Sequence, residues 1–245
     1  MNMRKCVSVL AAVMIALSAH ADSRVPVVVE LFTSEGCSSC PPADALVAEL
    51  SAKQPVSGVE IIVLGEHVDY WNYIGWRDRS SSAQWTKRQH SYVQRMKLDS
   101  AYTPQVVIDG KIQLVGGDHR AAITAITSSA EQPKPVEVGL SFTGDTLSVK
   151  IQSKKPVEAE VIVALTENDL TTKVGAGENG GRTLRHTAVT RMLLPLGVMR
   201  GNSFSAIKEM KIAPDWNRKE LGAVVFVQQK GQGPILGAAS IAVSQ

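Results

Sequence analysis

The sequence predicts an α/β fold followed by an all-β, sandwich-like region. Up to about residue 130, apolar runs of strand length alternate with helix-like segments. A short proline-containing segment, Glu131–Pro135, interrupts this pattern and is typical of a linker. Beyond it the hydrophobic residues alternate with a period of two, and turn residues separate the runs. The 245 residues are enough for two domains. We therefore assign residues 22–131 to an α/β domain and residues 136–245 to a β-sandwich-like domain.

The first region alternates strands and helices before it ends in a hairpin and a helix. Asp109-Gly110 is a dipeptide favoured in tight hairpin turns, and Asp118 can cap the last helix. In chain order the expected elements are a strand at Val27–Phe32, a helix at Asp44–Ala52, a strand at Val59–Leu64, a helix at Ser80–Leu98, two strands at Gln105–Ile108 and Lys111–Val115, and a helix at His119–Ser129.

The second region consists of alternating segments separated by turns such as Thr143-Gly144-Asp145. Several short strands of this kind favour two packed antiparallel sheets. The glycine-rich stretch Lys173–Gly181 is expected to be an exposed loop. The expected strands are Val136–Phe142, Leu147–Ile151, Ala159–Leu165, Ala223–Val227 and Ile235–Val243.

Residues 1–21 have the pattern of an export signal. Arg4 and Lys5 precede an apolar run at Val7–Leu17, and Ala19-His20-Ala21 is a small-x-small cleavage site. The run is shorter than the roughly 20 residues that span a bilayer. We expect a periplasmic or secreted protein with no membrane anchor after cleavage. The net charge is only +3, and Arg4 and Lys5 supply two of those charges, so we expect no nucleic-acid partner.

Signal cleavage would remove Cys6 and leave only Cys37 and Cys40, a C-x-x-C pair between a predicted strand and a predicted helix. A helix N-terminus lowers the pKa of a thiol there, which favours redox chemistry. We expect Cys37 to be the exposed nucleophile and Cys40, one turn into the helix, to be the shielded resolving thiol. A purely structural disulfide is the alternative, but a loop this short gains little stability from closure.

The residues around this pair resemble a known family. The segments Glu30–Asp44 and His67–Trp76, together with Gly177–Leu184, resemble the motifs of the DUF1223 family of secreted, thioredoxin-like proteins without an established activity. The resemblance implies a thioredoxin-like domain in residues 22–131. It also implies a cis bond between Thr103 and Pro104, with Pro104 packed against the cysteines and the backbone of Thr103 binding substrate.

Thioredoxins also keep a buried carboxylate beneath the dithiol, and the resemblance makes Glu30 the candidate proton carrier. Glu30 is one residue too far upstream, so a bulge would be needed to align it, and an exposed glutamate at the strand end is the alternative. Glu35 is closer to the cysteines but is expected to be solvated.

Four aromatic residues gather in one segment: Tyr70, Trp71, Tyr73 and Trp76. They could form a binding face, with Tyr70, Trp71 and Trp76 as substrate contacts, or a small core that holds a long loop.

His67 and Asp69, together with the two thiolates, could bind copper or zinc. We expect instead that His67 hydrogen-bonds within its loop. His186 shows no partner pattern and is expected to make ordinary polar contacts.

These observations predict an exported thiol–disulfide oxidoreductase that acts through Cys37 and Cys40. No Lys, Arg or His flanks Cys37, which favours a reductant or an isomerase over a strong oxidant. We expect a protein or small-molecule disulfide or thiol as substrate, an electron donor that the sequence does not identify, and no cofactor. The alternative is a thioredoxin-like module that binds copper, zinc or a partner without turnover.

Overall fold

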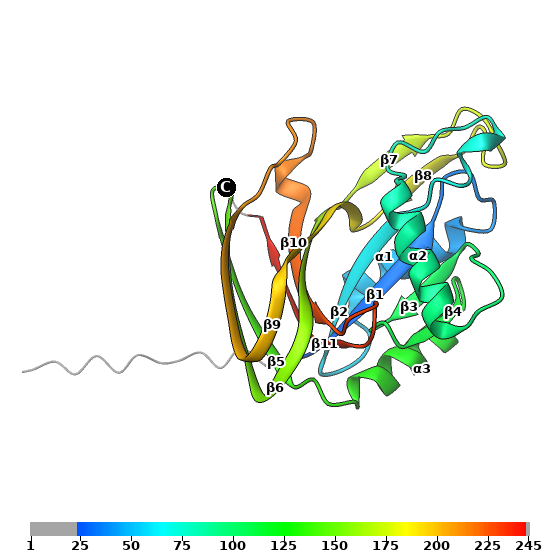
Figure 1. Ribbon diagram of the computed structural model, residues 1–245. Coiled ribbons are helices and arrows are strands. Elements are labelled where there is room, and N and C mark those ends of the chain that lie inside the picture. Colours follow the sequence, from blue (N-terminus) through cyan, green and yellow to red (C-terminus); the bar gives the residue numbers. More distant parts are fainter. Residues whose placement is uncertain (1–23, 244–245) are drawn as a thin grey trace, which may run out of the picture.

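The protein has a mixed α/β fold, described here from a computed structural model for residues 24–243 (Figure 1). The predicted export signal, residues 1–21, lies outside the described residues. In the first half the predicted order of strands and helices is confirmed. The elements are β1 (Val25–Thr33), α1 (Pro41–Lys53), β2 (Val59–His67), the 3-10 helix η1 (Asn72–Ile74), α2 (Ala83–Met96), β3 (Gln105–Ile108), β4 (Ile112–Val115) and α3 (His119–Ala130).

The second half is built on two long antiparallel strands, β6 (Thr146–Glu167, 22 residues) and β9 (Val189–Glu209, 21 residues), which pair along most of their length. The first part of β6 also pairs with β5 (Val136–Thr143) and its last part with β10 (Leu221–Gln228), so these strands belong to one sheet that packs on one apolar core. The elements are β5 (Val136–Thr143), β6 (Thr146–Glu167), β7 (Leu170–Lys173), β8 (Thr183–His186), β9 (Val189–Glu209), the 3-10 helix η2 (Arg218–Glu220), β10 (Leu221–Gln228) and β11 (Ile235–Ala242).

Strand pairing joins the two halves. β2 pairs in parallel with the start of β9, through Gly65 and Val189, so nine strands from both sides of the predicted linker form one sheet. The Gly65 amide donates to the Ala188 carbonyl at 2.8 Å. A Cβ atom at Gly65 would lie 3.2 Å from the Thr187 carbonyl oxygen, which explains why a glycine occupies this crossing. The start of β9, and β8 just before it, are thereby held against the first half.

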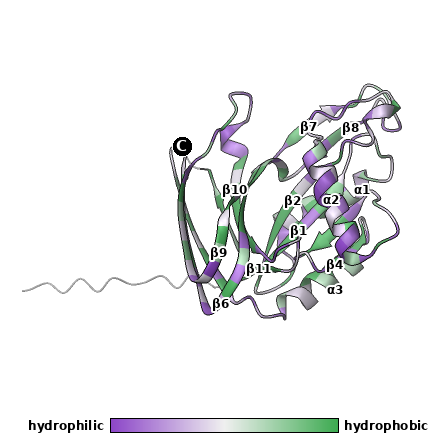
Figure 2. Cartoon of the chain, in the orientation of Figure 1, coloured by the Kyte–Doolittle hydropathy of each residue, from purple (hydrophilic) through white to green (hydrophobic). Residues whose placement is uncertain are grey.

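The two faces of β1 pack against different helices. Val27, Val29 and Leu31 lie in the core that α1 and α3 cover, whereas the side chain of Glu30 contacts residues of α2 on the other face. This follows from the strand pleat, in which successive side chains point to opposite faces. Figure 2 shows hydrophobic residues along the strands and hydrophilic residues on much of α2. Within residues 24–243 no helix has the length and apolar character needed to cross a membrane.

The carboxyl ends of the parallel strands β1 and β2 lie side by side, since Thr33 pairs with His67. The loops that follow these two strands contain the cysteine pair and the aromatic segment. Open α/β sheets bind ligands at this edge. The small sheet of β7 and β8 lies above the same edge in Figure 1. The fold therefore collects loops from both halves of the chain at one place.

Candidate functional site

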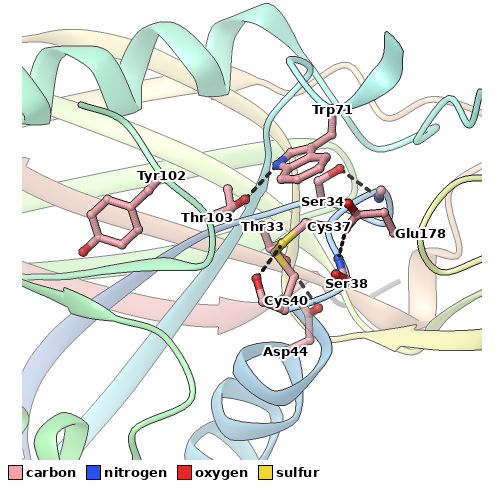
Figure 3. The surroundings of a disulfide bond; sticks show 12 residues. Thr33, Ser34, Cys37, Ser38, Cys40, Asp44, Trp71, Tyr102, Thr103 and Glu178 are labelled. Carbon is pink, nitrogen blue, oxygen red and sulfur yellow. Dashed lines mark hydrogen bonds between the residues drawn. A yellow bond between two sulfur atoms is a disulfide. The ribbon is translucent and has the colours of Figure 1, made fainter. Parts of the chain in front are cut away.

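Cys37 and Cys40 form a disulfide in the loop between β1 and α1 (Figure 3), with their Cα atoms 5.4 Å apart. Cys40 is the N-cap of α1 and Cys37 lies in the preceding turn, so the prediction that Cys40 lies one turn inside the helix is wrong. The reason is the Pro41-Pro42 pair. Prolines are favoured in the first helical turn, where their missing N–H groups leave no bond unmade, and they fix the helix start after Cys40.

The disulfide is buried. The side chains of both cysteines are fully inaccessible, so the expectation that the Cys37 sulfur is exposed is wrong for this oxidised state. Ser38 and Ser39 between them are exposed. The Ser39 hydroxyl lies 3.3 Å from the Cys37 Sγ atom, and it is the donor because a disulfide sulfur carries no hydrogen. A thiol that attacks this bond must therefore first displace part of its cover.

Part of that cover comes from the second half of the chain. The Asn179 Nδ2 group donates to the carbonyl oxygens of Glu35 and Cys37, both at 2.9 Å, and its side chain is fully buried. The Ser38 amide donates to Glu178 Oε2 at 3.0 Å (Figure 3). The predicted exposed loop is thus exposed only in part, and two of its residues hold the backbone of the cysteine loop.

Beside this loop lies a buried ion cluster centred on His186 of β8. Its Nε2 atom is 3.6 Å from Glu35 Oε1 and its Nδ1 atom is 3.7 Å from Asp44 Oδ1. Both distances are too long for hydrogen bonds, so these are ion pairs. Burial alone would lower the pKa of His186, but the two carboxylates raise it to about 10. His186 is therefore an imidazolium at neutral pH. The expectations that Glu35 is solvated and that His186 is unremarkable are wrong.

A second buried pair lies against the first. The His67 Nδ1 atom is 2.7 Å from Asp78 Oδ2, and the same carboxylate accepts the Glu35 amide at 3.0 Å. Burial would raise the pKa of Asp78, but His67 and backbone amides lower it to about 2. The rings of His67 and His186 meet edge to face, with centroids 4.6 Å apart. His67 thus bonds within its own segment, as expected.

The alternative metal site is not assembled. Asp69 Oδ1 accepts the Thr86 hydroxyl at 2.6 Å, whereas His67 contacts Asp78. Within residues 24–243 no group of three or more His, Cys, Asp or Glu side chains is arranged to hold a metal ion. In this oxidised state, the donor set that the sequence suggested for copper or zinc is therefore not brought together.

Glu30 is fully buried on the α2 face of the sheet. Its Oε2 atom accepts from Arg88 Nε and its Oε1 atom from the Tyr92 hydroxyl, both at 2.5 Å. The bulge that would align Glu30 with the dithiol is absent, since β1 pairs with β2 in continuous register. The alternative prediction, that Glu30 is an exposed glutamate at the strand end, is also wrong. Glu30 lies on the face of the sheet opposite α1. Arg88 also pairs with a second buried carboxylate, since its Nε atom lies 3.4 Å from Oε1 of Glu66. Burial raises the pKa of Glu66 well above its usual value.

The expected cis bond between Thr103 and Pro104 is present. The Thr103 hydroxyl accepts from Trp71 Nε1 at 2.8 Å beside the disulfide (Figure 3). Pro104 packs close to Gly116: a Cβ atom there would lie 3.0 Å from Pro104 and 2.6 Å from the Cβ of Ala43 in α1. Thr103 and Pro104 thus lie near the start of α1.

The aromatic residues divide between the two roles considered for them. Trp71 packs on Gly36, and Trp76 Nε1 donates to Glu35 Oε2 at 2.8 Å, so both hold the cysteine loop. The Tyr70 hydroxyl instead donates to Gln89 of α2 at 3.1 Å. Tyr73 is 83% exposed. The structure thus gives Trp71 and Trp76 a supporting position and leaves the ring of Tyr73 free for contact.

Comparisons with known proteins agree with this architecture. The structure is similar to the crystal structure of a protein from Agrobacterium tumefaciens, with a TM-score of 0.77 and 28% sequence identity, over 91% of this chain and 96% of that one. A search of curated proteins finds no match. The family described as "Protein of unknown function (DUF1223)" matches residues 28–228, which include the cysteine pair, Asn179 and His186. Because that match spans most of the chain, the protein belongs to the DUF1223 family.

Proposed function

We propose that the protein is an exported thiol–disulfide oxidoreductase whose first half is a thioredoxin-like domain. One observation carries the proposal: Cys37 and Cys40 form a disulfide in the turn that starts α1, at the sheet edge where loops from both halves meet. A disulfide that spans two intervening residues constrains the unfolded chain little, so it is a poor structural element. An oxidising compartment outside the cytoplasm, as the export signal suggests, would maintain such a pair.

The exchange proceeds in two steps that conserve atoms and electrons. The Cys37 thiolate of the reduced protein attacks one sulfur of a substrate disulfide, forms a mixed disulfide and releases the first substrate thiolate. The Cys40 thiolate then attacks the Cys37 sulfur, restores the internal disulfide and releases the second thiolate. Two electrons pass to the substrate, and the protons of the two protein thiols end on the substrate thiols. A thiol reductant must then reduce the protein again.

The surroundings support Cys37 as the attacking group. Its sulfur already accepts a hydrogen bond from the Ser39 hydroxyl, a donor that would also stabilise a thiolate. Cys37 is followed directly by the exposed Ser38 and Ser39, whereas Cys40 is the N-cap of α1 and is followed by the prolines that begin the helix. A substrate could contact the segment of Thr103, Trp71 and Tyr70 next to this loop. This arrangement is compatible with either a protein disulfide or a small-molecule disulfide as substrate.

The local charges support a reducing direction. Glu35 and Asp44 are buried and Glu178 is bonded to the cysteine loop, with His186 as the buried cation that contacts Glu35 and Asp44. Carboxylates near a thiol disfavour its thiolate, and a dithiol whose thiolate is less stabilised is a stronger reductant. We therefore propose a reductase or isomerase rather than a strong oxidant.

The test is to trap the mixed disulfide with the full-length chain. Cys40→Ala should accumulate a mixed disulfide through Cys37 when a disulfide substrate is added, whereas Cys37→Ala should form none and should lose reduction of a small aromatic disulfide. In the reduced wild-type protein, Cys37 should react with iodoacetamide before Cys40. Exchange activity that survives in Cys37→Ala, or an internal disulfide that excess dithiothreitol cannot open in the folded protein, would contradict the proposal.

A further inference from the structure

The side chain of Glu178 contacts the cysteine loop at the backbone amide of Ser38, the residue that directly follows Cys37. Its Oε2 atom accepts from the Ser38 N–H at 3.0 Å, although the two residues are 140 positions apart. Hydrogen bonds with the Ser38 side chain and with this amide lower the pKa of Glu178, so the side chain is an anion at neutral pH. Neighbouring Asn179 fixes the geometry because it bonds the carbonyl oxygens of Glu35 and Cys37. Arg182 in turn holds Asn179, with Nη1 2.8 Å from Oδ1.

The backbone amides of this loop are mostly occupied. A thiolate before a helix is normally stabilised by nearby N–H groups that point at the sulfur. Here the Cys37 amide bonds to the Ser34 carbonyl and the Cys40 amide to the Cys37 carbonyl, both at 3.2 Å. The Ser38 amide bonds to Glu178. Among the described residues, the donor that reaches the Cys37 sulfur is the Ser39 hydroxyl.

We propose that Glu178 is a positioning residue that makes the Cys37–Cys40 pair more reducing, because its carboxylate occupies the Ser38 amide and places a negative charge at the residue next to Cys37. The inference rests on the proposed thiol–disulfide exchange and assigns the second half of the chain a part in it. When the disulfide opens, the Cys37 sulfur takes up negative charge, and Glu178 repels it. Ser39 acts in the opposite direction because it donates to the same sulfur.

The experiment compares charge-matched variants of the full-length protein. Glu178→Gln removes the charge but keeps an oxygen that can accept from the Ser38 amide, and Glu178→Asp keeps the charge. Glu137→Gln, at an exposed position on β5, is the control. For each protein the ratio of reduced to oxidised pair is measured at equilibrium with dithiothreitol. The rate at which iodoacetamide alkylates Cys37 is measured across pH 5–10.

Glu178→Gln should raise the equilibrium constant for reduction roughly two- to five-fold and move the alkylation profile to lower pH. Because Glu178 is exposed, this difference should shrink as salt rises from about 0.01 M to 1 M. Ser39→Ala should shift both quantities in the opposite direction, and Glu178→Asp should remain close to the wild type. A merely structural contact would not show the salt dependence or the opposite signs.

Two results would overturn the inference. One is a Glu178→Gln protein that matches Glu137→Gln in both measurements while the wild type exchanges disulfides, which would leave the proposed function intact. The other is a shift of Glu178→Gln in the same direction as Ser39→Ala. If the wild-type disulfide cannot be opened in the folded protein, the proposed function and this inference fail together, so the two failures are distinguishable.

Discussion

Replacement of His186 by Gln tests the buried ion cluster directly. The imidazolium of His186 lies between Glu35 and Asp44, and the pKa of His186 rises from 6.5 to about 10 in the folded protein. At about 1.4 kcal/mol per pH unit, this change corresponds to a stabilisation of at most roughly 5 kcal/mol. Removal of one partner from a buried ion pair costs about 3–5 kcal/mol, which agrees with that limit. We expect His186→Gln to lose about 3–5 kcal/mol of unfolding free energy at pH 6.

The pH dependence gives this prediction its sign. A group whose pKa is raised on folding stabilises the folded protein. This stabilisation is complete at pH values below the pKa of the group in the unfolded chain, and it is lost as the pH rises through the pKa in the folded protein. The wild type should therefore be more stable than His186→Gln by the full amount at pH 6, and the difference should decline between pH 6.5 and about 10. Lysine and tyrosine titrations occur in both proteins and cancel in the difference.

The assay is urea unfolding of the oxidised proteins at pH 6, 8 and 10. His119→Gln is the control, because His119 is an exposed histidine on α3, and a change there should lie within about 0.5 kcal/mol of the wild type. The reasoning is refuted if His186→Gln loses less than about 1 kcal/mol at pH 6, or if its difference from the wild type is the same at pH 6 and pH 10.

Two further predictions concern the other buried charges. Asp78→Asn should lose about 2 kcal/mol of unfolding free energy at pH 6; because the pKa of Asp78 is lowered on folding from 3.8 to about 2, urea titrations should show the difference shrinking as pH falls toward 2, and a constant difference would contradict this. Arg88→Gln leaves Glu30 and Glu66 buried without their cation and should cost about 3–5 kcal/mol, with the exposed Arg120→Gln as control; adding Glu30→Gln should restore part of the loss, and a further loss instead would count against the pairing.

Two features of the site follow from local sequence rules alone. Strand alternation already places Glu30 and Leu31 on opposite faces of β1, and Leu31 belongs to the apolar face that a helix after the strand would cover. Glu30 could therefore have been excluded as a group beneath the dithiol. The position of Cys40 as N-cap could likewise have been inferred from Pro41-Pro42, because two prolines in a row fit the first helical turn.

The sequence by itself determined the order of strands and helices in the first half and the place of the cysteine pair at the start of α1. These features follow from local rules: hydrophobic period, turn residues and the missing amide of proline act within a few residues. In the second half the sequence did not show that Leu147–Ile151 and Ala159–Leu165 are parts of one strand, and it missed β7, β8 and β9. The same rules could not reveal that Asn179 and His186, about 140 residues away, reach the cysteine loop and its buried acids.

Only the tertiary structure decided that part of the site. Pairing of β2 with β9 brings β8 to the end of β1, where His186 meets Glu35 and Asp44. Read singly in the sequence, a histidine, an asparagine and two carboxylates in separate segments look like surface residues. Their burial is tolerated because each charge or amide meets its partner there, and such partners are contacts in space that no local pattern encodes.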